Sequence, residues 1–139
     1  MALTAESASA LPELTGLLDT VAGLKRAGGD HTLYRSLLAR YVAGQSDALA
    51  QIQTALIAGD LAMAERLAHT LKGVSGAIGA ITVQGLAAAL EQALRQRAGR
   101  AGVDPLLVQA GAALAELITA LQAAPLTEPT PEAAGSLVA

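Results

Sequence analysis

The chain has 139 residues, a formal net charge of −3 and 53% hydrophobic residues, yet its only aromatic side chains are two tyrosines. The acidic balance and the shortage of aromatic rings argue against a nucleic-acid-binding protein, which needs a basic surface and stacking platforms. With no cysteine, the chain can hold no disulfide, catalytic thiolate or sulfur-ligated metal. The first residues lack a signal-peptide pattern and polar residues interrupt the longest apolar runs, so we expect a soluble, cytoplasmic protein without membrane contact.

The first half of the chain predicts three helices, because apolar residues recur at helical spacing between breaks of glycine and aspartate. A short first helix covers about residues 14–27. Asp30 is a suitable N-cap for a long second helix that ends near Ala58. Asp60 repeats the signal and opens a third helix over roughly residues 61–79.

The second half of the chain predicts two further helices. Thr82 caps a helix that ends near Ala98, and residues 99–102 form a turn. Asp104 and Pro105 then start a last helix over roughly residues 105–123, with the proline in its first turn. The sequence therefore predicts an all-α protein, an antiparallel four-helix bundle with a short additional N-terminal helix.

The composition also predicts the limits of the domain. Residues 1–12 are small and polar, and we expect a flexible N-terminal segment there. Residues 13–124 form the bundle domain. Residues 125–139 are rich in proline, threonine and glutamate, which bury little apolar surface, so we expect a flexible C-terminal tail or linker.

The third predicted helix places one histidine, His69, opposite its apolar side. At about 100° per residue, the apolar side chains of this segment fall within roughly 40° of one line, and His69 lies about 160° away. This apolar seam consists of Leu67, Leu71, Val74, Ile78 and Ile81. We therefore expect an exposed imidazole, and the interpretation below requires that no neighbouring acid sequesters it.

Charged residues and glycines surround His69 on the same helical wheel. Glu65, Lys72 and Gly76 lie beside it, and Arg66 and Gly73 lie on its flank. A glycine inside a helix costs about 1 kcal/mol relative to alanine. The glycines at this face therefore indicate clearance for another protein's active site.

Residues 69–80, HTLKGVSGAIGA, resemble the active segment of histidine-containing phosphotransfer (HPt) domains, whose pattern is H-x-L-K-G-(small)-S-x-x-(aliphatic)-G-A. Val74 departs from the pattern, where a smaller residue is usual. The resemblance extends over about residues 15–122. The matching positions are His69, Leu71, Lys72, Gly73, Ser75, Ile78, Gly79 and Ala80.

The resemblance implies a phosphocarrier rather than a complete enzyme. His69 would accept a phosphoryl group from a receiver-domain aspartate and pass it to another receiver domain, as a free-standing module or part of a hybrid histidine kinase. Lys72 would pair with the phosphoryl oxygens, while Arg66, Glu65, Gly73 and Gly76 would meet the partner. No metal or cofactor is expected on this chain, because phosphoryl transfer relies on positioning and charge, and the receiver would supply Mg²⁺.

Two other functions stay open at this point. The chain could be the N-terminal phosphoacceptor domain of a chemotaxis-type histidine kinase, or a helical adaptor that is not phosphorylated. A monomer is the simplest expectation, with docking on an apolar patch of the first helix and the histidine helix. For the remaining polar residues, we expect the Ser75 hydroxyl to bond the carbonyl of Leu71. Gln84, Glu91 and Arg95 are placed at the border of the docking surface.

Overall fold

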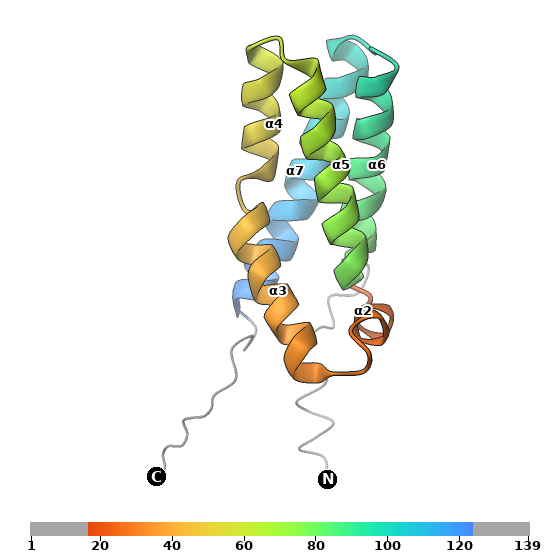
Figure 1. Cartoon of the computed structure of the whole chain (residues 1–139). Coiled ribbons are helices and arrows are strands. Elements are labelled where there is room, and N and C mark those ends of the chain that lie inside the picture. Colours follow the sequence, from red (N-terminus) through yellow and green to blue (C-terminus); the bar gives the residue numbers. More distant parts are fainter. Residues whose placement is uncertain (1–16, 124–139) are drawn as a thin grey trace, which may run out of the picture.

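The computed structural model describes residues 17–123, and these fold into an antiparallel bundle of helices (Figure 1). The all-α prediction is confirmed. The predicted terminal segments, 1–12 and 125–139, lie outside the described residues, as do residues 14–16 of the predicted first helix. The helices are α2 (Thr20–Arg26), α3 (His31–Gln45), α4 (Ala48–Ile57), α5 (Leu61–Ile78), α6 (Ile81–Arg95) and α7 (Arg100–Ala123).

Aspartate side chains cap three of these helices through hydrogen bonds. The carboxylates of Asp30 and Asp60 accept backbone N–H bonds of 3.0 Å from Leu33 and Met63, as the sequence predicted. Asp19 caps α2 in the same way. The described part of the first helix is therefore shorter than predicted, because Asp19 places its start at Thr20.

The predicted second helix is wrong in one respect: it is two helices, α3 and α4, separated at Ser46 and Asp47. The Ser46 hydroxyl donates to the carbonyl of Val42, and Asp47 leaves helical geometry with φ −102° and ψ 12°. Short polar side chains compete for backbone groups in this way and weaken a helix interior. Figure 1 shows the chain changing direction between α3 and α4.

The starts of α6 and α7 also differ from the prediction. Ala80, not Thr82, is the N-cap residue of α6 and makes no side-chain cap bond. The turn predicted at residues 99–102 is already the first turn of α7, which begins at Arg100, so Pro105 lies inside the helix. An ion pair of 2.8 Å between Arg100 and Asp104 supports this first turn.

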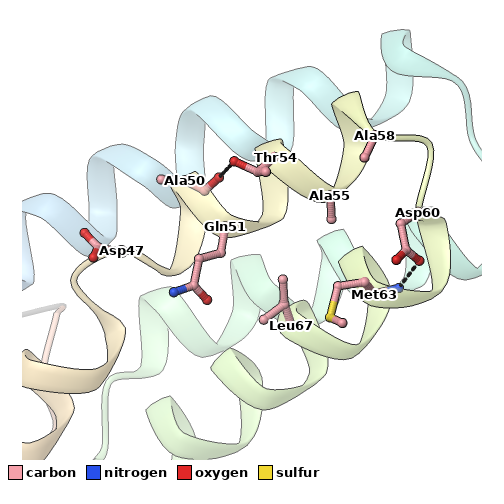
Figure 2. A pocket seen from close by; sticks show the side chains of 9 residues that line it. All are labelled: Asp47, Ala50, Gln51, Thr54, Ala55, Ala58, Asp60, Met63 and Leu67. Atoms are coloured by element: carbon pink, nitrogen blue, oxygen red, sulfur yellow. Dashed lines mark hydrogen bonds between the residues drawn. The ribbon is translucent and has the colours of Figure 1, made fainter.

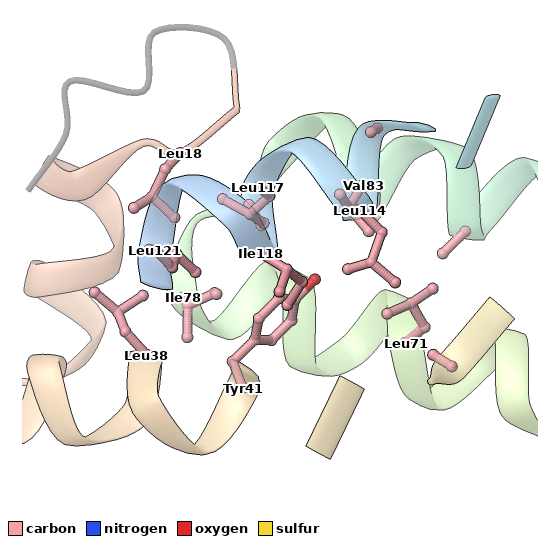
Figure 3. Packing of buried hydrophobic residues seen from close by; sticks show 14 of the residues in the cluster. Leu18, Leu38, Tyr41, Leu71, Ile78, Val83, Leu114, Leu117, Ile118 and Leu121 are labelled. Atoms are coloured by element: carbon pink, nitrogen blue, oxygen red, sulfur yellow. The ribbon is translucent and has the colours of Figure 1, made fainter. Parts of the chain in front are cut away.

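Two hydrophobic clusters fill the bundle. The larger one holds bulky side chains where α3, α5 and α7 meet (Figure 3). The second, smaller cluster lies where α4, α5, α6 and the start of α7 meet. The seam of α5 is buried at Leu71 and Ile78, but Ile81 is 51% exposed because it begins the next helix.

The C-terminal end of α5 is fixed against α2. Gly79 ends α5 with φ 87°, a conformation that favours glycine, and its carbonyl accepts a 2.6 Å bond from the Asp19 N–H. The buried Tyr34 hydroxyl donates to the carbonyl of Ile78 at 2.7 Å. These contacts set the end of the helix that carries His69.

Helix α7 has the length and composition of a membrane-spanning helix. Its buried side chains nevertheless pack into both clusters of the bundle, as those of a core helix do.

Candidate functional site

His69 lies near the middle of α5 with its imidazole facing solvent. Its side chain is 64% exposed, as the helical wheel predicted. One ring nitrogen is engaged: Nδ1 lies 2.8 Å from Oε2 of Glu91 on α6. No described residue bonds Nε2.

Glu91 is the centre of a small ion-pair network. Its side chain is only 3% exposed, and its Oε1 lies 2.7 Å from Nζ of Lys72. Its Oε2 lies 2.6 Å from Nη2 of Arg95, one turn later on α6. Arg95 also reaches Glu65 on α5, with 3.0 Å between Nε and Oε2. The network therefore links α5 and α6 on both sides of His69.

The hydrogen bond from Lys72, with that from His69, holds the pKa of Glu91 below its ordinary value, although burial opposes this shift. An ionised carboxylate only accepts hydrogen bonds, so Nδ1 of His69 carries the proton. In the neutral ring, the lone pair is then on Nε2, the nitrogen exposed to solvent. Glu91 thus selects the tautomer and orients the ring without occupying the second nitrogen.

The sequence interpretation required that no neighbouring acid tie up the His69 ring permanently. An acid does hold one ring nitrogen, but it leaves the other available. Sequence reasoning placed Glu91 at the border of a docking surface and missed this contact. One signal was available, because Glu91 follows Leu90 and lies one turn after Ala87 on the buried stripe of α6. A carboxylate on such a stripe requires charged or hydrogen-bonding partners.

The two flanking residues predicted to meet a partner are accessible. Arg66 is exposed and makes no ion pair with a described residue; its Nη1 makes a weak 4.0 Å contact with the sulfur of Met63. Gly73, one turn after His69, has open space where a Cβ would point. Both are consistent with clearance on this flank of the histidine.

Gly76 does not lie on that open surface, and its predicted role is wrong. Gly76 is buried, and a Cβ added there would lie 2.5 Å from the side-chain amide nitrogen of Gln84. Helix α6 crosses α5 closely at this point. The missing side chain at Gly76 therefore serves helix packing, not the approach of a partner.

Ser75 also differs from its expected contact. Its buried hydroxyl lies 2.8 Å from the hydroxyl of Tyr41, not on the carbonyl of Leu71. Burial raises the pKa of Tyr41 to about 12, so this is a neutral pair of hydroxyl groups. The contact joins α5 to α3 inside the larger cluster.

Surface depressions among residues 17–123 border α5 on several sides. One of about 560 Å³ lies between α4 and α5 beside Met63 and Leu67 and does not include His69 (Figure 2). A polar cleft of about 350 Å³ adjoins His69 between α5 and α6, with Arg66 and Arg95 among its lining residues. An apolar groove of about 240 Å³ follows α3 and α5 past Val74.

Acidic side chains near His69 do not form a metal-binding cluster. Within residues 17–123, no group of three or more histidine, aspartate and glutamate side chains is arranged to hold a metal ion. The carboxylate of Glu91 is instead occupied by the His69 ring and by the cations of Lys72 and Arg95. The supply of Mg²⁺ by a receiver domain stays a prediction.

Comparison with known proteins identifies the family. A family model described as the Hpt domain matches residues 36–124, more than half of the chain, and the chain belongs to this family. Histidine phosphotransfer in a phosphorelay is thus its general activity; Hpt domains are phosphocarriers that interact with receiver domains. Searches of curated proteins and of solved structures returned no match. The resemblance noted upstream of residue 36 stays a prediction.

Proposed function

We propose that Nε2 of His69 accepts a phosphoryl group from the aspartyl phosphate of one receiver domain and passes it to the aspartate of another. The observation that carries this proposal is the pairing of an exposed imidazole with a buried carboxylate that holds only Nδ1. Such a ring is both accessible and fixed in orientation, as a shuttle between two partners requires.

The chemistry needs no proton transfer at the reacting nitrogen. The lone pair of Nε2 forms a bond to phosphorus, and the bond from phosphorus to the aspartyl oxygen breaks, leaving its electron pair on the carboxylate. The ring keeps its Nδ1 proton and becomes positively charged. Glu91, 2.8 Å from Nδ1, compensates this charge where it develops. The reverse sequence delivers the group to the second receiver.

Lys72 has a second role in this proposal. Its ammonium lies one turn from His69, 34% exposed, and is held 2.7 Å from Glu91. A phosphoryl group on Nε2 would offer it oxygens with more negative charge, and an ammonium with three donors can share both partners. Arg66, exposed and without an ion pair to a described residue, is suited to contact the phosphoryl group or the partner's acidic site.

The receiver would dock over the α3–α5 side of His69. Gly73 leaves open space there, and the apolar groove beside Val74 adjoins it. This assigns the apolar part of the contact to α3 and α5, where the sequence suggested the first helix and the histidine helix. The receiver would supply Mg²⁺, and the exchange would occur in the cytoplasm.

The test is transfer from receiver domains carrying radiolabelled phosphate, with His69→Gln as the key variant. Wild-type protein should acquire label that is acid-labile and base-stable, and His69→Gln should acquire none. The matched control is His31→Gln, since His31 is exposed at the start of α3, far along the chain from the site. Label that persists in His69→Gln, or no transfer to wild type from any cognate donor, would contradict the proposal. Transfer only from a kinase domain with ATP would indicate the chemotaxis-type alternative.

A further inference from the structure

We propose that Arg95 changes partner on phosphorylation: it leaves Glu65 and binds the phosphoryl group that His69 has accepted. This inference rests on the proposed function, because it concerns the phosphorylated state of the same site. The observation that carries it is a shared acceptor. Oε2 of Glu91 lies 2.8 Å from Nδ1 of His69 and accepts a 2.6 Å bond from Nη2 of Arg95. The imidazole and the guanidinium are therefore neighbours across a single atom.

Arg95 and His69 also line the same cleft. The polar cleft of about 350 Å³ between α5 and α6 has both side chains on its surface, together with Glu65 and Arg66. Arg95 is 55% exposed, so its guanidinium can turn within the cleft without leaving a buried position. A phosphoryl group on the solvent-facing Nε2 would border this cleft and its two guanidinium groups.

The bond between Arg95 and Glu65 is easily exchanged. It is a single contact of 3.0 Å from Nε to Oε2, and both side chains are accessible, at 55% and 35% exposed. Exposed ion pairs of this kind contribute little to stability, because water solvates both partners after they part. Glu65 pairs with no other described cation, so its carboxylate becomes hydrated when Arg95 leaves.

A phosphoryl group is a stronger partner for Arg95 than Glu65 is. It carries nearly two negative charges, and the planar guanidinium can bind two of its oxygens at once. Nη1 of Arg95 donates to no described residue, and Nε becomes available when Glu65 is released. Phosphorylation also makes the ring of His69 positive. The ring then bonds Oε2 of Glu91 more strongly, which weakens the competing bond from Arg95.

The exchange would place cations on both sides of the phosphoryl group. Lys72 lies one turn after His69 on α5, whereas Glu65 holds Arg95 at the turn before it. These cations bind a phosphoryl dianion more strongly than the loose, metaphosphate-like transition state of its hydrolysis. Contact with Arg95 should therefore lengthen the life of the phosphohistidine, and competition from Glu65 should shorten it.

The test is the lifetime of phosphohistidine on the full chain, loaded with phosphoramidate so that no receiver domain is needed. In this loading Nε2 bonds to phosphorus, the phosphorus–nitrogen bond of the donor breaks, and ammonia leaves with the electron pair. Only the label absent from His69→Gln is counted. Arg95→Gln should shorten the lifetime about 3- to 10-fold, and Glu65→Gln should lengthen it about twofold. The double variant should match Arg95→Gln, because Glu65 acts only through Arg95.

Two controls separate the exchange from a general loss of charge. Arg100→Gln breaks the exposed 2.8 Å ion pair with Asp104 on α7, and it should leave the lifetime unaltered. The NMR signal of the Nε–H group of Arg95 should shift when wild type is phosphorylated, because a phosphoryl oxygen replaces a carboxylate; that of Arg100 should not. Circular dichroism melts confirm that each variant is folded.

The outcomes distinguish this inference from the proposed function. Equal lifetimes for wild type and Arg95→Gln, or a lifetime for Glu65→Gln shorter than that of wild type, would overturn the inference alone, because His69 would still be phosphorylated. A wild type that takes no label beyond that of His69→Gln would count against the proposed function and the inference together.

Discussion

Helix α5 makes two contacts that involve buried polar side chains, one with α6 and one with α3, and the two contacts differ in how far they reach. Toward α6, Glu91 is 3% exposed but bonds side chains that reach solvent, among them His69 at 64%. Toward α3, Ser75 is fully buried and bonds Tyr41, which is also buried. The contact with α6 extends from the interior to the surface, whereas the contact with α3 lies entirely in the interior.

The comparison separates a site from a structural contact. A neutral hydroxyl pair satisfies both partners and needs nothing further. A buried carboxylate is costly unless several charged donors compensate it, and a fold keeps such a group most readily where its charge has a use. The position of Glu91 under the only exposed imidazole of α5 supplies that use.

The largest effect is expected on the rate of phosphoryl transfer, when Glu91→Gln removes the charge from the contact between α5 and α6. The amide keeps the size of the side chain but removes the negative charge that opposes the positive ring. We expect the rate of transfer to His69 to fall about 10- to 100-fold, as for other partners that orient a reacting imidazole. Rapid-quench transfer from a labelled receiver measures this rate.

Glu116→Gln is the matched control, because it makes the same chemical change at an exposed position of α7. Its transfer rate should equal that of wild type. A rate for Glu91→Gln within about twofold of wild type would remove Glu91 from the mechanism.

Local signals in the sequence were enough for most of the fold. Asp30 and Asp60 cap their helices, and the apolar spacing placed Leu71 inside and His69 outside. These features depend on residues within one or two turns. The break at Ser46 and Asp47 was not predicted because apolar spacing continues across it: Tyr41 and Ala48, seven residues apart, are both buried.

The site itself depends on contacts between helices, which the wheel of one helix does not describe. Glu91 reaches His69 because α6 packs beside α5 in one particular register, 22 residues along the chain. The same close crossing places Gln84 over Gly76 and buries a position that the wheel of α5 alone leaves exposed. Residues on α5 were therefore identified from sequence, whereas Gln84, Glu91 and Arg95 on α6 were named without their contacts.

The next largest effect is on the free energy of unfolding, and it distinguishes the open side of α5 at Gly73 from the side packed against α6 at Gly76. Gly76→Leu should lower the free energy of unfolding by about 1–3 kcal/mol, because the new side chain meets Gln84. Gly73→Leu, with open space around it, should leave stability unchanged or raise it by up to about 1 kcal/mol through helix propensity. Urea unfolding measures both.

The same pair should behave oppositely in transfer assays. Gly73→Leu should slow transfer, because it narrows the approach to His69, whereas folded Gly76→Leu should transfer nearly normally. If Gly73→Leu transferred at the wild-type rate while Gly76→Leu was as stable as wild type, the assignment of the two glycines would be reversed.

A smaller effect on the free energy of unfolding is expected from changes to the buried contact between Tyr41 and Ser75. Tyr41→Phe removes one hydroxyl and leaves that of Ser75 buried without its partner, at a cost of about 1–3 kcal/mol in unfolding free energy. Ser75→Ala alone should cost a similar amount, and the double variant should cost less than the sum of the two. All three should retain the wild-type transfer rate; a slowed rate in the folded double variant would show that this contact also supports the site.

The smallest expected effect is a dependence of stability on pH that Glu91 alone introduces. The pKa of its carboxyl is lowered below 4.5 in the folded protein, first by the hydrogen bond from Lys72 and also by that from His69. A depressed pKa stabilises the folded state above the unfolded value, and this contribution is lost as the pH falls through the folded value. The unfolding free energy of wild type, minus that of Glu91→Gln, should therefore be constant just above pH 4.5 and decline below it. Subtracting the variant cancels the other carboxylates, so a difference that stays flat through this acid range would mean that the network around Glu91 does not hold it ionised.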